Sequence, residues 1–155
     1  MCKLCWTFLL CALVAIGGMT YKFIISGETV ISEDGRQTLL LEASERDLIL
    51  TEMRTFLSAA QQIIQAANDD DSETIAAAAA SVGRAAQAAV PGSLIKKLPL
   101  EFKKLGFDTH SKFDEIAKTA EQFGDPDVSL KQLSTLMQNC VICHEAYRVD
   151  AIPAQ

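Results

Sequence analysis

Two cysteines and a histidine stand close together near the end of the chain. Cys140, Cys143 and His144 form the pattern C-x-x-C-H. Two thiols three positions apart lie on the same side of a helix, so both can form thioether bonds with the two vinyl groups of one porphyrin. The imidazole that follows can bind the iron as its proximal ligand. The pattern therefore predicts one covalently attached c-type haem per chain.

Two other kinds of site use similar residues. A zinc site needs about four ligands, and beyond these three the part of the chain after the N-terminal apolar segment offers only the distant His110. A redox dithiol needs its C-x-x-C pair at a helix N-terminus beside a strand, where the thiol pKa is lowered. Here the pair falls near the end of a predicted helix. The pattern favours haem, with zinc and dithiol as alternatives.

The composition limits the kind of molecule that carries this motif. The chain has 155 residues, of which 49% are hydrophobic and 22% charged, as expected for one globular domain with a core. Lys3 and Lys22 are the charged residues before Gly27, so the remainder keeps 12 basic and 20 acidic residues and a net charge of −8. A domain this acidic argues against nucleic acid as a partner.

The first 26 residues resemble a signal sequence or a signal anchor. Lys3 is followed by an uncharged stretch over 4–21, which is about the length that crosses a hydrocarbon core of about 30 Å. The nearest cleavage site, Ala15-Ile16-Gly17, is followed by further apolar residues, so we favour an uncleaved anchor. Cys2 and Cys5 have no further ligands nearby and are interpreted as incidental thiols.

The haem motif gives this anchor an orientation. In a bacterium c-type haem is attached outside the cytoplasm, so the N-terminus is expected inside and the haem domain in the periplasm, at the inner membrane. Residues 27–43 then form a spacer. Within it, Thr29-Val30-Ile31 and Thr38-Leu39-Leu40-Leu41 flank an Asp-Gly turn, which predicts either a small β-hairpin or an extended tether.

Helical periodicity follows from Ser44 onward. Apolar residues recur at spacings of three and four, and capping residues, Pro and Gly divide them into four amphipathic segments. The predicted helices are 44–67, 73–89, 108–123 and 129–147. One long and two short connections favour an all-α fold, an antiparallel four-helix bundle over 44–150 behind the N-terminal helix.

The long connection, 91–107, contains four lysines. They form the one basic patch of an acidic domain: Lys96, Lys97, Lys103 and Lys104. The patch is either a solvated loop surface or a docking surface for an acidic redox partner, which would speed encounter more than it raises affinity.

Residues after the motif add a specific resemblance. Tyr147 and Arg148 complete a C-x-x-C-H-x-x-[Tyr/Phe]-Arg run close to the C-terminus, on the last helix of the expected bundle. This resembles the class II c-type cytochromes, the cytochrome c-prime family, over about Ser44 to Arg148. The resemblance implies thioether bonds at Cys140 and Cys143, proximal ligation by His144, and supporting roles for Tyr147 and Arg148 around the haem. It also allows a homodimer through the first two helices of the bundle.

Arg148 is expected one helical turn beyond His144. There a cation either raises the haem potential or stabilises the C-terminus of the helix.

The sixth position of the iron decides what the site does. In the class II family this position faces the first helix of the bundle, and the resemblance implies that Met53 is the ligand. Met137 lies on the helix of His144 and is interpreted as core. His110 is either a ligand, a propionate partner or a hydrogen-bonded histidine at a helix start.

Two functions follow from these alternatives. With Met53 bound, the resemblance implies a six-coordinate c-type cytochrome that carries electrons and is not an enzyme. Without that bond, it implies a five-coordinate haem protein that binds nitric oxide or carbon monoxide. A peroxidase is disfavoured because Glu52, the acid or base nearest this position on the first helix, lies beside the apolar stripe.

Overall fold

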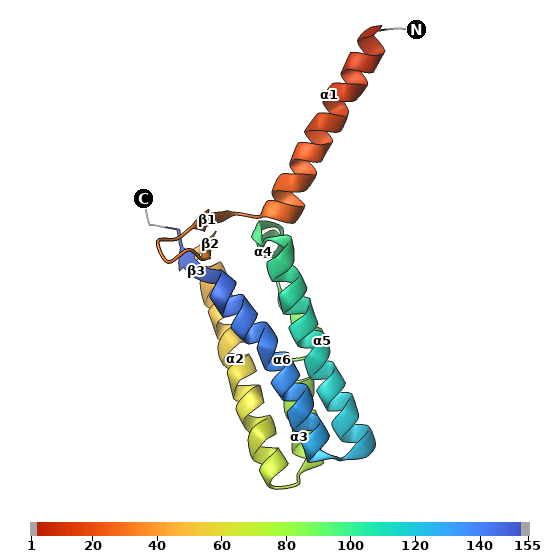
Figure 1. Cartoon of the computed structure of the whole chain (residues 1–155), viewed down its shortest axis with the longest axis vertical. Helices are drawn as coiled ribbons and strands as arrows, with labels where there is room; N and C mark the ends of the chain where they lie inside the picture. Colours follow the sequence, from red (N-terminus) through yellow and green to blue (C-terminus); the bar gives the residue numbers. More distant parts are fainter. Residues whose placement is uncertain (1–2, 153–155) are drawn as a thin grey trace.

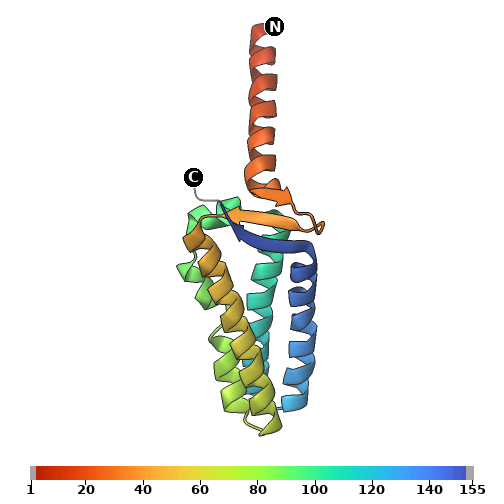
Figure 2. The same ribbon diagram turned by 90° about the vertical axis from the view of Figure 1, so that its left-hand side faces the viewer.

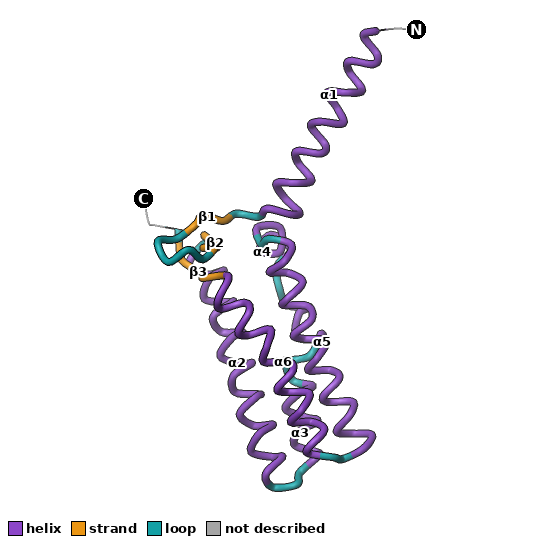
Figure 3. Tube along the Cα trace, viewed as in Figure 1, coloured by secondary structure: helices purple, strands orange, loops and turns teal. Residues whose placement is uncertain are grey.

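The computed structural model describes residues 3–152 of the chain and shows a mostly helical molecule with one small sheet (Figures 1 and 3). The α-helices of this part are α1 (Lys3–Thr20), α2 (Ala43–Asn68), α3 (Ser72–Ala80), α4 (Gly92–Lys97), α5 (Leu100–Phe123) and α6 (Pro126–Ala146). Its strands are β1 (Thr29–Ile31), β2 (Gln37–Leu41) and β3 (Tyr147–Ala151). A π-helical segment, Tyr21–Ser26, follows α1, and a 3₁₀ segment, Arg84–Ala89, follows α3.

The N-terminal helix stands apart from the rest of the molecule. Helix α1 extends away from the other helices, and none of its residues is buried (Figure 2). Its 18 residues, most of them apolar, span about 27 Å at 1.5 Å per residue. The helix is therefore long and apolar enough to be a membrane span or a signal sequence. Cys2 lies outside the described residues, and Cys5 is exposed on α1.

Four helices enclose the main core. Helices α2, α3, α5 and α6 contact one another, and α2 and α5 run away from the sheet while α3 and α6 run back toward it (Figure 1). The largest side chains buried between them are Ile63, Ile75, Phe113, Ile116 and Leu136. The alanines of α3 are small, so this helix lies close to its neighbours.

The predicted helix over 73–89 is wrong in its second half. Helix α3 ends at Ala80 and a turn at 81–83 separates it from the 3₁₀ segment. A Cβ atom at Gly83 would overlap the carboxylate of Asp114, and that carboxylate accepts a hydrogen bond from the backbone N–H of Arg84 at 3.1 Å. The contact of Asp114 on α5 with Gly83 and Arg84 therefore stabilises the break after α3. The alanine-rich sequence does not indicate this tertiary contact.

The predicted connection over 91–107 is largely helical. It contains α4, and α5 begins at Leu100 directly after Pro99, eight residues before the predicted start at Asp108. Proline is tolerated at a helix start, and Gly106 lies inside α5 with open space beside it. Helix α6 likewise begins at Pro126 and not at Ser129, because the Asp125 carboxylate accepts hydrogen bonds from the N–H groups of Asp127 and Val128.

The three strands cap the same end of the molecule from which α1 projects. Strands β1 and β2 pair antiparallel as a hairpin, and β2 also pairs with β3 in parallel, from Gln37 beside Tyr147 to Leu41 beside Ala151. The prediction that the last helix reaches Tyr147 is therefore wrong by one residue, and the residues after it extend along β2. A second core lies beneath the sheet; its buried side chains are Leu39, Leu41, Ile49, Leu94, Leu98, Phe102 and Tyr147.

Candidate functional site

A cavity of about 430 Å³ opens between α2, α5 and α6 near the sheet. Side chains from α6 form one wall: Leu136, Met137, Asn139, Cys140, Cys143 and His144. Met53, Phe56 and Leu57 from α2 form the wall opposite, and Phe102, Leu105 and Phe113 from α5 lie between them. The lining is mainly apolar with a few polar groups, and the volume lies in the range of small-molecule and cofactor sites.

The predicted attachment residues lie together on one wall. Cys140 is exposed, Cys143 is half-buried and His144 is exposed, and all three line the cavity from the last turns of α6. Helical spacing of three positions puts both thiols on the cavity side. The guanidinium of Arg36, from the hairpin turn, donates to the backbone carbonyls of His144 at 3.4 Å and of Tyr147 at 3.5 Å. It thereby holds the end of this helix.

The electrostatics of the thiols differ from those of a redox dithiol. Burial raises the pKa of both thiols, that of Cys143 to about 11, and the Cys140 charge adds to the effect on Cys143. A reactive dithiol has a lowered thiol pKa and lies at a helix N-terminus, whereas this pair lies at the end of α6. Within residues 3–152, no three His, Cys, Asp or Glu side chains gather as a metal cluster of the zinc type.

Met53 occupies the wall that faces these residues. It is half-buried, packs against the second core and lines the same cavity as Cys140 and His144. Met137 lines the cavity from α6 and is 45% exposed, on the same helix as His144. Met53 thus lines the cavity from a different helix than His144, whereas Met137 shares the helix of His144, and its exposure shows that the interpretation of Met137 as core is wrong.

The structure does not bring His110 to this cavity. The imidazole is buried; Nδ1 donates to the Val82 carbonyl at 2.7 Å, and Nε2 lies 3.3 Å from Oε1 of Glu52. Burial lowers the pKa of His110, but the bonds to Glu52 and Val82, together with the Glu52 charge, outweigh it and leave the pKa raised. His110 is therefore hydrogen-bonded through both ring nitrogens, but it lies inside α5 and not at the helix start that the sequence-based alternative assumed.

Tyr147 and Arg148 do not line the cavity, in contrast to the expected supporting roles. Tyr147 is buried in the second core, where its ring stands edge-on to Phe102 with the centroids 5.3 Å apart. Phe102 itself lines the cavity, so Tyr147 contacts one of the lining side chains.

The expected position of Arg148, one helical turn beyond His144, is wrong. Arg148 lies on β3, where its guanidinium nitrogens approach Asp150 at 3.0 Å and Asp34 at 3.9 Å. The pairing of β3 with β2 ends the helix before this residue.

A polar network beside the cavity was missed in the sequence. The side-chain N–H₂ of Asn139 donates to Asp108 at 2.7 Å and to the hydroxyl of Thr109 at 3.2 Å, and Lys112 donates to its carbonyl at 3.2 Å. These bonds join α6 to α5 directly before Cys140. The signal in the sequence was an asparagine, Asn139, on the apolar face of the predicted last helix. An amide buried at such a position requires hydrogen-bond partners.

The four lysines of the predicted basic patch lie on two helices. Lys96 and Lys97 belong to α4, and Lys103 and Lys104 belong to α5. Lys97 pairs with Glu45 at 2.8 Å, and Lys104 pairs with Glu101 at 2.7 Å. The charges of Lys97 and Lys104 are therefore offset by carboxylates of the same chain.

Comparison with protein-family models, curated proteins and solved structures finds no match to this chain.

Proposed function

We propose that the chain is a membrane-anchored c-type cytochrome similar to the class II family, with one haem in the cavity between α2, α5 and α6. The single observation that carries the proposal is the placement of Cys140, Cys143 and His144 on one wall and Met53 on the wall opposite. The residues fit the group in chemistry as well, because an apolar cavity with two thiols at helical spacing suits covalent attachment of a flat apolar macrocycle.

The proposed scaffold is an antiparallel four-helix bundle formed by α2, α3, α5 and α6, with α1 as its N-terminal anchor. The mutual contacts of these helices and their alternating directions support this assignment. In such bundles, cofactor sites are built from side chains on facing helices, and here the facing helices would be α2 and α6.

Haem, when bound, supplies reversible one-electron chemistry. In this proposal Cys140 and Cys143 hold it to α6, His144 binds the iron on that side, and Met53 binds it from α2. Phe56 and Phe113 would shield the cavity from water on the core side, which together with the thioether ligand favours a high reduction potential. The proposed activity is electron transfer and not enzymatic turnover.

The alternative is a five-coordinate haem that binds nitric oxide or carbon monoxide. The observation that favours it is the apolar character of the α2 wall, where Phe56, Leu57 and Ala60 also line the cavity. If Met53 does not reach the iron, these side chains would surround an open binding position.

Optical spectra separate the two functions. The full chain is produced with the c-type maturation machinery, and ferric and ferrous spectra are recorded with and without carbon monoxide. A low-spin spectrum that carbon monoxide does not change supports Met53 ligation. In Met53→Ala we expect a high-spin spectrum and carbon monoxide binding, whereas Met137→Ala, which removes a methionine from the same cavity, should keep the parent spectrum. An unchanged spectrum in Met53→Ala contradicts ligation by this residue.

The cellular arrangement is also part of the proposal. We infer that α1 spans the bacterial inner membrane with its N-terminus inside, and that the haem domain lies in the periplasm and receives or donates electrons through an acidic partner. Docking at Lys96, Lys97, Lys103 and Lys104 predicts that the electron-transfer rate falls as ionic strength rises. Protease added to spheroplasts tests the orientation, because it should cleave the haem domain from the anchor. Sedimentation in detergent tests pairing into a homodimer.

A further inference from the structure

A second cavity lies beside the first and shares four lining residues with it: Glu52, Phe56, Phe102 and Gly106. Its volume is about 280 Å³, and its walls come from α2, the 3₁₀ segment Arg84–Ala89, α4 and α5. Most of its lining is apolar: Leu48, Val90, Leu94, Ile95, Leu98 and Phe107. A cavity about half this size, if apolar, binds benzene, so there is room here for a substituted aromatic ring.

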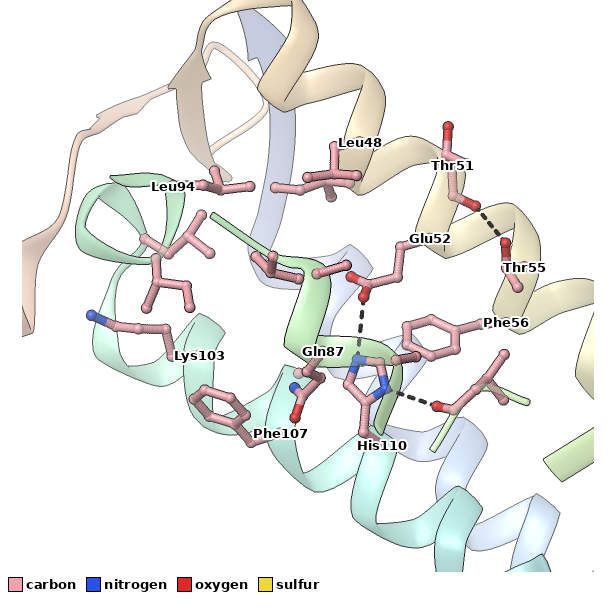
Figure 4. Close-up of a pocket in the computed structure, with 18 of the residues that line it drawn as sticks. Leu48, Thr51, Glu52, Thr55, Phe56, Gln87, Leu94, Lys103, Phe107 and His110 are labelled. Atoms are coloured by element: carbon pink, nitrogen blue, oxygen red, sulfur yellow. Dashed lines mark hydrogen bonds and ion pairs between the residues drawn. The ribbon is translucent and has the colours of Figure 1, made fainter. Parts of the chain in front are cut away.

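A pair of polar side chains interrupts this apolar surface. Figure 4 shows the Glu52 carboxylate and the His110 ring turned toward one another beside Phe56, with Gln87 close by and Leu48 and Leu94 farther along the cavity. Nδ1 of His110 must carry a proton, because its partner, the Val82 carbonyl, can only accept. The contact of His110 with Glu52 uses one of about four acceptor positions of that carboxylate.

The other polar groups near this end are already used within their own helix. The hydroxyl of Thr51 donates to the carbonyl of Asp47 at 2.7 Å, and the hydroxyl of Thr55 donates to the carbonyl of Thr51 at 3.0 Å. The Ser81 hydroxyl donates to the Ala78 carbonyl at 2.7 Å, and Lys103 lines the cavity away from Glu52 (Figure 4). The recognition groups beside His110 are the Glu52 carboxylate and the Gln87 amide. A carboxylate selects a ligand that offers a hydrogen-bond donor.

The cavity lies at the end of the molecule that faces the anchor. Helix α4, which supplies Leu94 and Ile95, contacts the π-helical segment that continues α1 (Figure 1). The N–H of Glu28 donates to the Lys97 carbonyl at 2.7 Å, and a Cβ at Gly27 would overlap the backbone at Lys97 and Pro99. The wall of the cavity is therefore attached to the start of the proposed membrane span.

We propose that this second cavity binds an apolar aromatic molecule with a phenolic hydroxyl group, whose hydroxyl donates to Glu52 and whose ring and substituents contact Leu48, Leu94 and Phe107. The position beside the anchor suits a ligand that dissolves in the bilayer. The proposal does not rest on haem attachment: Gln87, His110 and Leu94 line only this second cavity, whereas Glu52 lines both, so haem content is measured in every variant.

The test uses the full chain in detergent micelles with three probes: 4-propylphenol, propylbenzene and phenol. The chain has two histidines, so ¹³C-histidine labelling gives few signals, and the His110 signal is assigned with a His110→Gln variant. Free ligand is measured by equilibrium dialysis, which corrects for partition into the micelles. We expect 4-propylphenol to shift the His110 signal saturably. It should bind about tenfold more tightly than propylbenzene, since a hydrogen bond to a charged group contributes at least that factor.

The probe without the alkyl chain tests the apolar walls. Each buried methylene contributes about a fourfold factor, so phenol should bind about 50-fold more weakly than 4-propylphenol. Equal affinity for the two phenols would mean that the apolar walls are not used, and equal affinity for 4-propylphenol and propylbenzene would mean that Glu52 is not used. Either result overturns the proposal.

A matched pair of variants locates the binding. Ala86 and Ala85 are both exposed on the 3₁₀ segment, but only Ala86 lines the cavity. Ala86→Trp should abolish the saturable shift, whereas Ala85→Trp should retain it. Glu52→Gln should weaken 4-propylphenol about fivefold and leave propylbenzene unchanged. Binding that persists in Ala86→Trp, or the lack of any saturable shift in the parent chain, overturns the proposal. Haem content is measured separately by haem stain.

Discussion

Asn139 joins the helix of the haem motif to its neighbour, and its removal should cost more than that of any exposed polar residue on the same helix. The Asn139 side chain is buried and makes three hydrogen bonds: to the Asp108 carboxylate at 2.7 Å, to Thr109 at 3.2 Å and from Lys112 at 3.2 Å. Neutral hydrogen bonds contribute about 1 kcal/mol each and those to charged groups about 1.5 to 3 kcal/mol. The sum of these three contributions is an upper limit for the loss of stability, because Asp108 is half exposed and Lys112 can reach water.

We therefore expect Asn139→Ala to lower the free energy of unfolding by about 2 to 3 kcal/mol. Thr135→Ala, one turn earlier on α6, removes an exposed hydroxyl that bonds only to the Lys131 carbonyl, and should change stability by less than about 0.5 kcal/mol. Urea unfolding of both variants, followed by far-ultraviolet circular dichroism, measures the difference. A loss in Asn139→Ala no greater than that in Thr135→Ala would refute the assignment of this network as the link between α5 and α6.

The same network predicts an acid dependence. Hydrogen bonds from Lys112 and Asn139 and the Lys112 charge outweigh burial and lower the pKa of Asp108. A carboxyl group with a lowered folded-state pKa contributes stability that is complete above its unfolded value, near 3.8, and is lost as the pH falls through the folded value. Asn139→Ala removes one of the causes, so the variant should lose less additional stability on acidification than the parent chain.

Three further outcomes are expected. Gly27 has a φ of +65° and no space for a Cβ against the backbone at Lys97, so Gly27→Ala should raise the rate of limited proteolysis between the anchor and the helical domain; an unchanged rate would contradict this packing. His110 has a raised pKa in the folded chain, so the stability that it contributes is complete below pH 6.5 and is lost as the pH rises through the folded-state pKa. His110→Gln should therefore remove this pH dependence of the free energy of unfolding, measured by urea unfolding. A pH dependence that persists in the variant would belong to another group. Cys143→Ala should greatly reduce covalent haem, and a haem-stained band of normal strength after denaturing electrophoresis would contradict thioether attachment.

Local signals were sufficient for some of these elements and insufficient for others. The helical nature of 44–67 and the hairpin strands follow from periodicity and turn residues, and Met53 appears on the apolar stripe that faces the motif. The break after Ala80 cannot be predicted from periodicity or turn residues, because it depends on Asp114, about 30 positions later in the chain. The early start of α5 was hidden by Pro99 and Gly106, residues that predict a loop unless the helix begins directly after the proline.

The end of α6 shows the same limit most clearly. Tyr147 and Arg148 can continue a helix as far as their local sequence is concerned, and only the parallel pairing with β2, more than 100 positions earlier, makes them a strand. The prediction that Arg148 lies one helical turn beyond His144 is wrong for that reason. Non-local pairing of this kind leaves no periodicity in a single sequence.

The sheet also fixes the distance across the proposed haem site. Strand β2 leads into α2, which carries Met53, and β3 follows directly from α6, which carries His144 (Figure 1). The β2–β3 ladder therefore ties the start of one cavity wall to the end of the other, with Leu39 and Tyr147 buried beneath it. A change in register by one residue would shift β2 relative to β3 by about 3.3 Å. Such a shift would move Met53 relative to His144. The strand residues between α1 and α2, which the sequence suggested as a spacer, are thus positioned to set the geometry on which the proposed iron ligation by both walls would depend.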